Sequence, residues 1–234
     1  MLATQTAKPK TVVFTGAGVS AESGLPTFRG SDGLWENHPV TQVACPQAWA
    51  ADPEMVLRFY NQRRRALAKV EPNAAHRAIA SLEAHCETLV ITQNIDDLHE
   101  RAGSTSVLHL HGEITKARSS WRDHLVYDIG YRDLELGETC ELNSQLRPHV
   151  VWFGEIPLLL DQACDAIASA DRVLVVGTSL QVQPAAGLLG FAPPDAEKIM
   201  ITLEPGHHPD GFELRQGRAS QLVPAVVSHW VGAI

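Results

Sequence analysis

An α/β fold built on a doubly wound parallel sheet is predicted by the alternation of two kinds of segment. Short apolar runs rich in β-branched residues recur along the chain, with helix-length stretches between them. The runs lack polar alternation, which indicates strands buried on both faces of a parallel sheet. Strands that alternate with helices are typical of such folds. The strands are expected at residues 11–15, 88–92, 107–110, 172–176 and 198–202. The helices are expected at residues 53–70, 73–86, 157–170 and 220–231.

Two stretches do not fit this alternation. Residues 31–71 separate the first two strands by more than one crossover helix needs, and residues 116–147 have mixed polarity and a turn signal. We interpret both as insertions that form a small lobe on a single domain spanning residues 1–234. Ligands of open α/β sheets bind beyond the carboxyl ends of the strands, so we expect a cleft between lobe and sheet. The main part of the domain is expected at residues 8–30, 72–115 and 148–234.

The overall composition is that of a folded soluble protein. Of 234 residues, 44% are hydrophobic and 20% charged, and 27 acidic against 19 basic residues give a net charge of −8. An electrostatic nucleic-acid binder needs a basic face, so a nucleic-acid partner is not expected. Residues 1–10 lack the apolar core of a signal peptide, and no apolar run approaches the ~20 residues of a membrane span. We therefore expect no membrane partner and a cytoplasmic location.

The four cysteines form no recognisable framework. Cys45, Cys86, Cys140 and Cys164 are scattered, without a CxxC pair. This spacing favours reduced thiols over disulfides or a zinc finger.

A glycine-rich turn follows the first expected strand. Gly16 permits a tight turn, Gly18 lets the backbone approach a pyrophosphate, and Ala21 lets the following helix pack on the strand. A purely structural strand-to-helix turn is the alternative for a single GxGxxA motif. No acidic residue closes a second strand ~20 residues later, which disfavours a hydride-transfer enzyme.

Several ordered motifs together resemble the sirtuin family. They are GAGVSAESGLPTFRGSDGLW at 16–35, QNID at 93–96, HGE at 111–113, RPHVVWFGE at 147–155 and GTS at 177–179.

The resemblance extends over residues 10–227 and carries several expectations. It implies a Rossmann-like large domain, a small lobe, and a channel in which NAD and an acyl-lysine peptide meet. The implied activity is NAD-dependent removal of acyl groups from protein lysines, giving nicotinamide, O-acyl-ADP-ribose and free lysine. NAD would be the co-substrate, acyl-lysine proteins the partners, and the enzyme a monomer.

His111 is the expected catalytic base. It follows the third expected strand, and histidine can accept a proton at neutral pH. The resemblance implies that it deprotonates a ribose hydroxyl of NAD. His109 should face the same side of the strand, so spacing alone does not choose between them, whereas the HG motif chooses His111.

Asn94 and Asp96 complete the expected catalytic set. An amide can hold a ribose hydroxyl or water, and a carboxylate can accept a hydrogen bond from the nicotinamide carboxamide. The resemblance assigns these roles and places Gln93 on the ribose. The alternative is that Asn94 or Asp96 caps a helix entering residues 97–102, which is compatible with catalysis.

The expected NAD-binding set extends over several loops. On the loop after the glycine turn, Phe28 could shield a developing positive centre and Arg29 could pair with a phosphate. The family usually has Asn where Thr202 stands, and Ala219 is expected near the adenine. The set comprises Gly16, Ala17, Gly18, Ser20, Ala21, Glu22, Thr27, Phe28, Arg29, Trp35, Gln93, Asn94, Ile95, Asp96, His111, Gly177, Thr178, Ser179, Thr202, Leu203, Glu204 and Ala219.

Tyr60 and Arg63 are expected to share one helix face, three residues apart. A phenol beside a guanidinium can bind a carboxylate, and the pair resembles that of sirtuins acting on succinyl-, malonyl- or glutaryl-lysine. Residues 44–50 would help to wall the pocket. Alternatively, Tyr60 is a core residue and arginines 63–65 form a solvated face. The remaining expected substrate residues are Val151, Trp152, Phe153, Gly154 and Glu155.

The small lobe departs from the family pattern. Most sirtuins hold a zinc ion with two CxxC pairs, where this chain has Ser119, Arg122, Cys140 and Asn143. One cysteine does not supply the four ligands of tetrahedral zinc, so no metal is predicted. The lobe is instead expected to be held by packing of Trp121, Leu125, Tyr127, Ile129, Tyr131, Leu134 and Leu136.

Two rival functions remain. Mono-ADP-ribosyl transfer would use the same NAD chemistry with a protein nucleophile, but needs no acyl pocket such as Tyr60 and Arg63 would form. A non-catalytic NAD-binding module would not need the set Asn94, Asp96 and His111.

Overall fold

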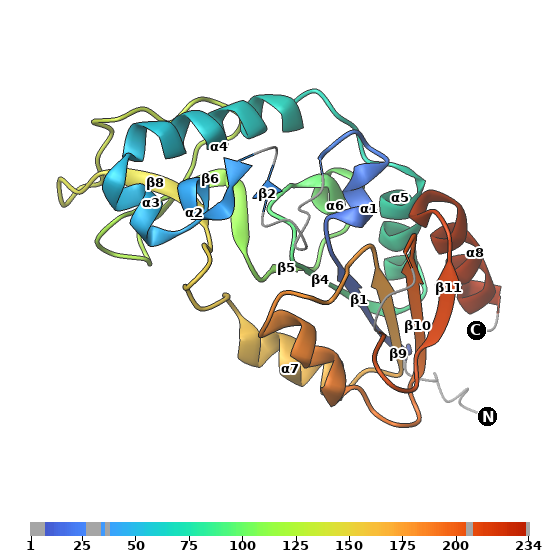
Figure 1. Cartoon of the computed structure of the whole chain (residues 1–234). Helices are drawn as coiled ribbons and strands as arrows, with labels where there is room; N and C mark the ends of the chain where they lie inside the picture. Colours follow the sequence, from blue (N-terminus) through green and yellow to red (C-terminus); the bar gives the residue numbers. More distant parts are fainter. Residues whose placement is uncertain (1–7, 27–33, 36–37, 205–207, 233–234) are drawn as a thin grey trace, which may run out of the picture.

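A six-stranded sheet forms the centre of the larger part of the molecule (Figure 1). The structure, a computed structural model, describes residues 8–26, 34–35, 38–204 and 208–232. All strand pairs of this sheet are parallel, in the order β11-β10-β9-β1-β4-β5, so the chain builds outward on both sides of β1. The strands are β1 (Lys10–Thr15), β4 (Glu87–Thr92), β5 (Val107–His109), β9 (Arg172–Val176), β10 (Glu197–Thr202) and β11 (Glu213–Gln216).

The predicted α/β class is therefore confirmed. Each predicted strand is present to within one residue, and β11 is an additional edge strand that the pattern does not predict. Its sequence, Glu-Leu-Arg-Gln, is largely polar, and none of its residues is buried.

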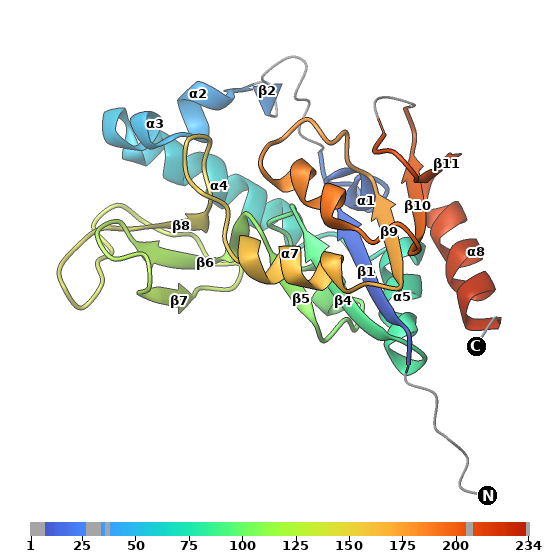
Figure 2. The ribbon, with the colours of Figure 1, turned by 90° about the horizontal axis from the view of Figure 1, so that it is seen from below.

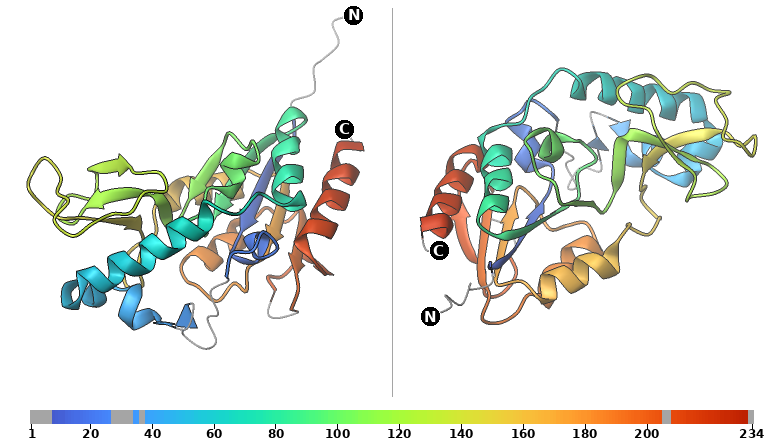
Figure 3. Two further views of the ribbon diagram at one scale, coloured as in Figure 1. Left: turned by 90° about the horizontal axis from the view of Figure 1, so that it is seen from above. Right: turned by 180° about the vertical axis from the view of Figure 1, so that it is seen from behind.

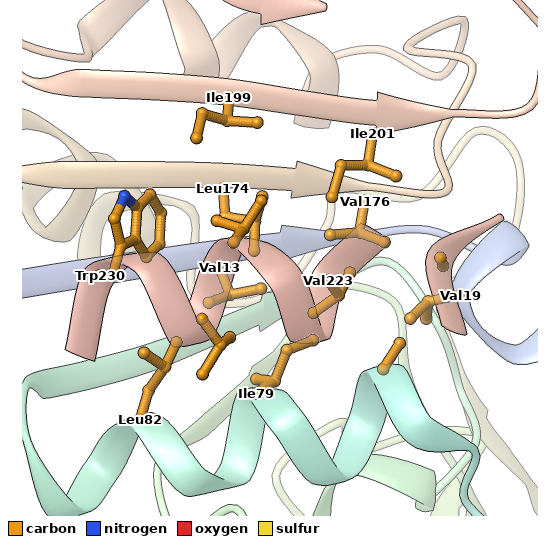
Figure 4. Packing of buried hydrophobic residues seen from close by; sticks show 14 of the residues in the cluster. Val13, Val19, Ile79, Leu82, Leu174, Val176, Ile199, Ile201, Val223 and Trp230 are labelled. Carbon is orange, nitrogen blue, oxygen red and sulfur yellow. The ribbon is translucent and has the colours of Figure 1, made fainter. Parts of the chain in front are cut away.

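Helices cover both faces of the sheet because side chains of a buried strand point alternately to either side. Val13 of β1 packs in a cluster with Ile79 and Trp230, as Figure 4 shows. Its neighbour Phe14 packs on the opposite face with Ile167. The first face carries α5 (Ala74–Ser81), η2 (Leu82–Ala84) and α8 (Ala219–Gly232), and the second carries α7 (Leu160–Ala168) and η3 (Ala185–Phe191).

The start of α5 is tied to the glycine turn. The Asn73 side chain accepts from the Ala75 N–H at 2.9 Å, and the Asn73 N–H donates to His76 Nδ1 at 3.3 Å, which together form a capping box. The Asn73 amide also donates to the carbonyl oxygen of Val19 at 2.8 Å. Val19 belongs to α1 (Gly18–Ala21), so one asparagine fixes both the helix start and the turn that precedes it.

A smaller lobe lies beside the parallel sheet (Figure 2). Its centre is an antiparallel sheet in the order β7-β6-β8. This sheet spans Gly112–Val150, beyond the predicted insertion at 116–147, because β6 begins directly after the segment that follows β5. The elements are β6 (Gly112–Ser119), β7 (Val126–Asp128), β8 (Leu146–Val150), the hairpin of β2 (Leu34–Trp35) and β3 (His38–Pro39), and helices α2 (Val40–Val43), α3 (Pro46–Ala51) and α4 (Pro53–Leu67).

Helix α4 is held against the lobe by a buried arginine. Arg64 is fully buried and donates to the carbonyl oxygen of Ile114 on β6 at 2.7 Å and to Asn61 Oδ1 at 2.6 Å. Burial lowers the pKa of Arg64 to about 10. The alternative of a solvated face of three arginines is therefore wrong for Arg64, although Arg65 is exposed and pairs with Asp133.

The interior of the lobe differs in part from the predicted one. Ile129 and Leu134 are buried as expected, against Leu57 of α4. Trp121 and Leu136 are 64% and 54% exposed, so their predicted role in the interior is wrong. Both residues lie in turns between strands, and turns run over the surface.

No helix in the described ranges is both long and apolar enough to span a bilayer.

Candidate active site

A cavity of about 1000 Å³ opens between the parallel sheet and the lobe. Figure 3 shows these two parts from further sides, with α4 running along the lobe. The cavity is lined by residues that directly follow β1, β4, β9 and β10, which are the carboxyl ends of parallel strands. It includes the point beside β1 where the strand order reverses, the usual ligand position in such sheets.

Glycines allow the turns after β1 and β9 to touch. The Gly18 N–H donates to the carbonyl oxygen of Gly177 at 2.7 Å. A Cβ on Gly18 would lie 2.7 Å from Gly177 Cα, and one on Gly16 would lie 2.7 Å from Thr178 Cβ. Gly177 has a φ of +65°, and its Cβ would lie 2.3 Å from the Val19 nitrogen. The absence of side chains at these positions allows the two turns to pack in direct contact, and both turns line the cavity.

His111 lies between the sheet and the lobe and lines the cavity. Its Nδ1 lies 2.9 Å from the carbonyl oxygen of Gln93, which can only accept, so Nδ1 carries the proton. In the neutral ring Nε2 is then a bare acceptor. Burial lowers the pKa of His111 below its ordinary value, although the Gln93 hydrogen bond opposes the shift. The ring is therefore a free base at neutral pH.

Ser20 joins the glycine turn to the loop after β4. Its hydroxyl donates to Asp96 Oδ2 at 3.0 Å and accepts from the Asn94 amide at 3.2 Å. A neutral His76, whose Nδ1 accepts from Asn73, can donate through Nε2 to the same hydroxyl at 3.4 Å. Burial lowers the pKa of His76 to about 4, which keeps that ring neutral. The orientations of Asn94 and Asp96 are thus set by a hydrogen-bonded network.

Asp96 has two roles in this loop. Its Oδ1 accepts from the Leu98 N–H at 3.2 Å, at the start of α6 (Leu98–Arg101). The N-cap residue of α6 is Asp97, whose side chain makes no capping hydrogen bond, and Asp96 is not the capping residue of this helix. The Asp96 side chain instead stabilises the turn that enters the helix, and the residue also lines the cavity. Burial raises the pKa of Asp96 to about 6, above the ordinary value of 3.8, and the Leu98 and Ser20 hydrogen bonds oppose the shift.

The family model of the Sir2 family matches residues 16–184 of this chain. The chain belongs to the Sir2 family. That match includes the glycine turn, the Gln93–Asp96 loop, His111 and the turn after β9.

Relatives and solved structures agree with the Sir2 assignment. A relative from Helicobacter pylori, named NAD-dependent protein deacylase, is 53% identical over 185 residues, covering 79% of this chain and 80% of the relative. One of the same name from Vibrio cholerae is 47% identical over 231 residues, covering 95% and 93%. A structure of a Sir2 homolog–NAD complex has a TM-score of 0.83 at 40% identity, covering 95% and 90%. A Sir2–p53 peptide–NAD+ complex has a TM-score of 0.78 at 30% identity, covering 97% and 95%.

Most of the residues expected to hold NAD lie together in this Sir2 chain. Thr27, Phe28, Arg29 and the side chain of Trp35 lie outside the described residues. The others line the cavity: Gly16, Ala17, Gly18, Ser20, Ala21, Glu22, Gln93, Asn94, Ile95, Asp96, His111, Gly177, Thr178, Ser179, Thr202, Leu203, Glu204 and Ala219.

Two of these residues also bond within the protein. Glu22 accepts from the Ser220 N–H at 3.0 Å and from its hydroxyl at 2.6 Å, at the start of α8. Gln93 donates to Thr178 Oγ1 at 3.0 Å, across the carboxyl ends of β4 and β9. Both bonds join two walls of the cavity.

Sequence reasoning missed part of the cavity wall. Leu67 and Ile114 line the cavity from the lobe, although nothing in their local sequence separates them from core residues. The segment after β9 extends the lining from Ser179 through Gln183.

Arg63 and Trp152 line the cavity from the side of the lobe. Tyr60 is fully buried and is not among the lining residues. The indole N–H of Trp152 donates to the Tyr60 hydroxyl at 3.0 Å. The cavity is also lined by Ala44, from the expected wall segment at 44–50, and by the expected substrate residues Val151, Phe153, Gly154 and Glu155.

A buried ion triad supports the segment that carries Trp152. Glu155 accepts from Arg147 at 2.7 and 2.9 Å and from Arg118 at 3.1 and 3.2 Å. The Arg147 guanidinium also stacks 3.3 Å from the centroid of the Trp152 ring. Burial acts to raise the pKa of Glu155, but the hydrogen bonds and charge of Arg147 outweigh it and hold the pKa below its ordinary value.

The family's zinc position is chemically altered. Cys140 Sγ lies 3.4 Å from Ser119 Oγ, in a lobe cluster that includes Leu146. Ser119, Arg122, Cys140 and Asn143 offer one thiol, which does not fit the four-ligand preference of structural zinc. No group of three or more His, Cys, Asp or Glu side chains is placed to hold a metal in the described part of the chain. The zinc-free lobe stays a prediction.

Proposed function

We propose that this protein is an NAD-dependent protein-lysine deacylase. One observation carries the proposal: a base, His111, lies in a single cavity that is walled by the glycine turns on one side and by Arg63 and Trp152 on the other. The relatives named NAD-dependent protein deacylase support the same activity. The reaction converts acyl-lysine, NAD and water into lysine, nicotinamide and O-acyl-ADP-ribose.

The glycine turns fit the NAD end of the reaction. Gly16, Gly18 and Gly177 let the two turns pack in direct contact, and all three glycines line the cavity. NAD would supply an anomeric carbon from which nicotinamide departs when the acyl oxygen attacks. The buried, hydrogen-bonded Asn94 and Asp96 would orient the ribose and the carboxamide at that end.

His111 would act as the general base. Its Nδ1–H is held by the Gln93 carbonyl, so Nε2 can take a proton from a ribose hydroxyl without a change of tautomer. The pKa of the ring, lowered by burial, keeps it unprotonated at neutral pH.

The activity is tested with acetyl-, succinyl- and glutaryl-lysine peptides incubated with and without NAD and followed by mass spectrometry. We expect NAD-dependent loss of the acyl group, with nicotinamide and O-acyl-ADP-ribose formed in equal amounts. Transfer of ADP-ribose to the peptide without loss of the acyl group would identify the rival transferase. No reaction of NAD with any peptide would contradict the proposal.

We further propose that acidic acyl groups are preferred. Arg63 is the guanidinium at the lobe end of the cavity, near the aromatic wall of Trp152. The Tyr60 hydroxyl accepts a hydrogen bond from the indole N–H of Trp152, so the buried phenol fixes the orientation of the Trp152 ring. A guanidinium can bind the distal carboxylate of a succinyl or glutaryl group through two hydrogen bonds.

Arg63→Met is expected to raise KM for succinyl-lysine peptide by about 10- to 100-fold, because a hydrogen bond to a charged group is lost. Turnover of acetyl-lysine peptide should change little. Arg65→Met is the matched control, since Arg65 lies on the same helix but is exposed and pairs with Asp133. Equal changes for both peptides, or the same change in the control, would contradict the preference.

Activity should fall on the acid side of about pH 6. The pKa of Asp96 is raised to about 6, so the carboxylate gains a proton as the pH drops through that value and one oxygen stops accepting. His111 loses its free base form in the same direction. The kcat/KM profile measures this, and a flat profile down to roughly pH 5 would contradict it.

A further inference from the structure

A second histidine, His109, is hydrogen-bonded to the backbone of the loop that carries Asn94 and Asp96. His109 ends β5, is 7% exposed, and is not among the residues that line the cavity. Its Nδ1 lies 3.1 Å from the carbonyl oxygen of Asn94, and its Nε2 lies 2.7 Å from Glu100 Oε1. Glu100 lies on α6, immediately after the loop that carries Asn94 and Asp96.

Both partners of this ring are acceptors. A backbone carbonyl has no hydrogen to donate, and neither has an ionised carboxylate. Each ring nitrogen of His109 must therefore carry a hydrogen, which makes the ring an imidazolium paired with Glu100. Burial acts to lower the pKa of His109, but the hydrogen bond and charge of Glu100 outweigh it and raise the pKa above its ordinary value.

His109 and His111 form hydrogen bonds with two consecutive backbone carbonyl groups. His111 donates to the carbonyl oxygen of Gln93, and His109 donates to that of Asn94. His109 is the last residue of β5, and His111 lies in the turn that follows it. The pair differs in the second nitrogen, because His111 faces the cavity while His109 is occupied by Glu100.

We propose that His109, held in its charged form by Glu100, is a positioning residue for the reaction: it fixes the peptide between Asn94 and Ile95. That peptide connects the Asn94 amide to the Asp96 carboxyl, so its orientation sets both side chains that the Ser20 hydroxyl bridges. This inference rests on the proposed deacylase function and assigns His109 no contact with substrate or NAD.

The charge also acts on the surrounding titratable groups. Glu100 on α6 and Glu113 on β6 both raise the pKa of His109. His109 in turn lowers the pKa of Asp96 in the loop and of His99 on α6. When the pH rises through the raised pKa of His109, the ring loses a proton. A bare nitrogen then faces either the Asn94 carbonyl oxygen or the Glu100 carboxylate, and one of the two hydrogen bonds is lost.

The test uses Glu100→Gln, since the Glu100 side chain is 39% exposed and its neutral isostere keeps the shape of the pair. Turnover of an acyl-lysine peptide should fall in the wild-type protein as the pH rises through the raised pKa of His109. Glu100→Gln should move that decline to lower pH, while activity below the shifted decline stays within about twofold of the wild type. The matched control is Glu71→Gln, which removes an exposed carboxylate from Arg101 on the same helix. Its profile should follow the wild type.

A second variant and a direct measurement complete the test. His109→Gln should lower kcat by about tenfold with little change in KM for NAD, because one donor to the loop or to Glu100 is lost. Nitrogen chemical shifts of the His109 ring should report both nitrogens protonated at neutral pH. Superimposable pH profiles of wild type and Glu100→Gln, or a neutral ring at pH 7, would overturn the inference. A wild-type protein without deacylation would instead reject the proposed function.

Discussion

His111→Ala is expected to reduce NAD-dependent deacylation by about 10²- to 10⁴-fold, the usual contribution of a general base. The physical reason is that Nε2 of His111 is the free acceptor at the cavity, while Nδ1 is held by the Gln93 carbonyl. Removing the ring removes both the base and one of the two histidine hydrogen bonds to backbone carbonyl groups of the loop. Steady-state kinetics with a peptide that the wild-type protein deacylates measures the effect.

His111→Asn separates these two losses. An asparagine amide can still donate to the Gln93 carbonyl but is not a base, so its activity should be as low as that of His111→Ala. The matched control is His85→Ala, which removes an exposed histidine at the far end of α5 and η2 and should keep full turnover. A His111→Ala protein that deacylates at the wild-type rate would contradict the assignment of the base.

The parallel sheet could be predicted because its strands are buried on both faces. Runs such as residues 172–176 are apolar after their first residue, and Val173 to Val176 are all fully buried. A sequence pattern records burial directly in such strands. The edge strand β11 has no such record, since Glu213 and Gln216 are exposed and only its hydrogen bonds to β10 define it.

The position of the site could also be predicted, but not the depth of each residue. Helical spacing places Tyr60 and Arg63 on one face, yet Arg63 reaches the cavity while Tyr60 lies buried beside Trp152. The burial of each residue on one face of α4 depends on how the rest of the lobe packs against that helix. That packing joins residues distant in sequence, such as Arg64 with Ile114, and no local pattern encodes it.

The chemical roles of His109 and His111 likewise could not be predicted from local spacing. Strand spacing puts His109 and His111 on one side, and spacing offers no means of telling a base from a structural ring. The difference lies in the partner of one nitrogen, which is Glu100 for His109 and the cavity for His111. Glu100 lies on α6, and its contact with His109 is not part of any strand or helix periodicity.

The triad around Glu155 should have the largest effect on stability. Glu155→Ala would leave Arg118 and Arg147, 5% and 7% exposed, without the carboxylate that both bind. It would also remove the acceptor of the Trp152 backbone N–H, at 2.8 Å. Since an unpaired buried charge costs more than a lost surface pair, we expect the free energy of unfolding to fall by about 3 kcal/mol. Urea denaturation measures the change.

Two further variants show whether buried charge causes the loss of stability in Glu155→Ala. One breaks an exposed ion pair, and the other replaces all three charged residues of the triad. Glu54→Ala, which breaks an ion pair with Arg58 whose side chains are 62% and 66% exposed, should cost less than about 1 kcal/mol. A triple variant that combines Arg118→Met, Arg147→Met and Glu155→Leu should recover much of the loss, because no charge of the triad stays buried. If the triple variant were no more stable than Glu155→Ala, the loss would come from packing of the segment that carries Trp152. The segment that carries Trp152 would then be stabilised by side-chain packing rather than by charge. Uncharged replacements of the triad residues would in that case disturb the cavity wall that this segment forms.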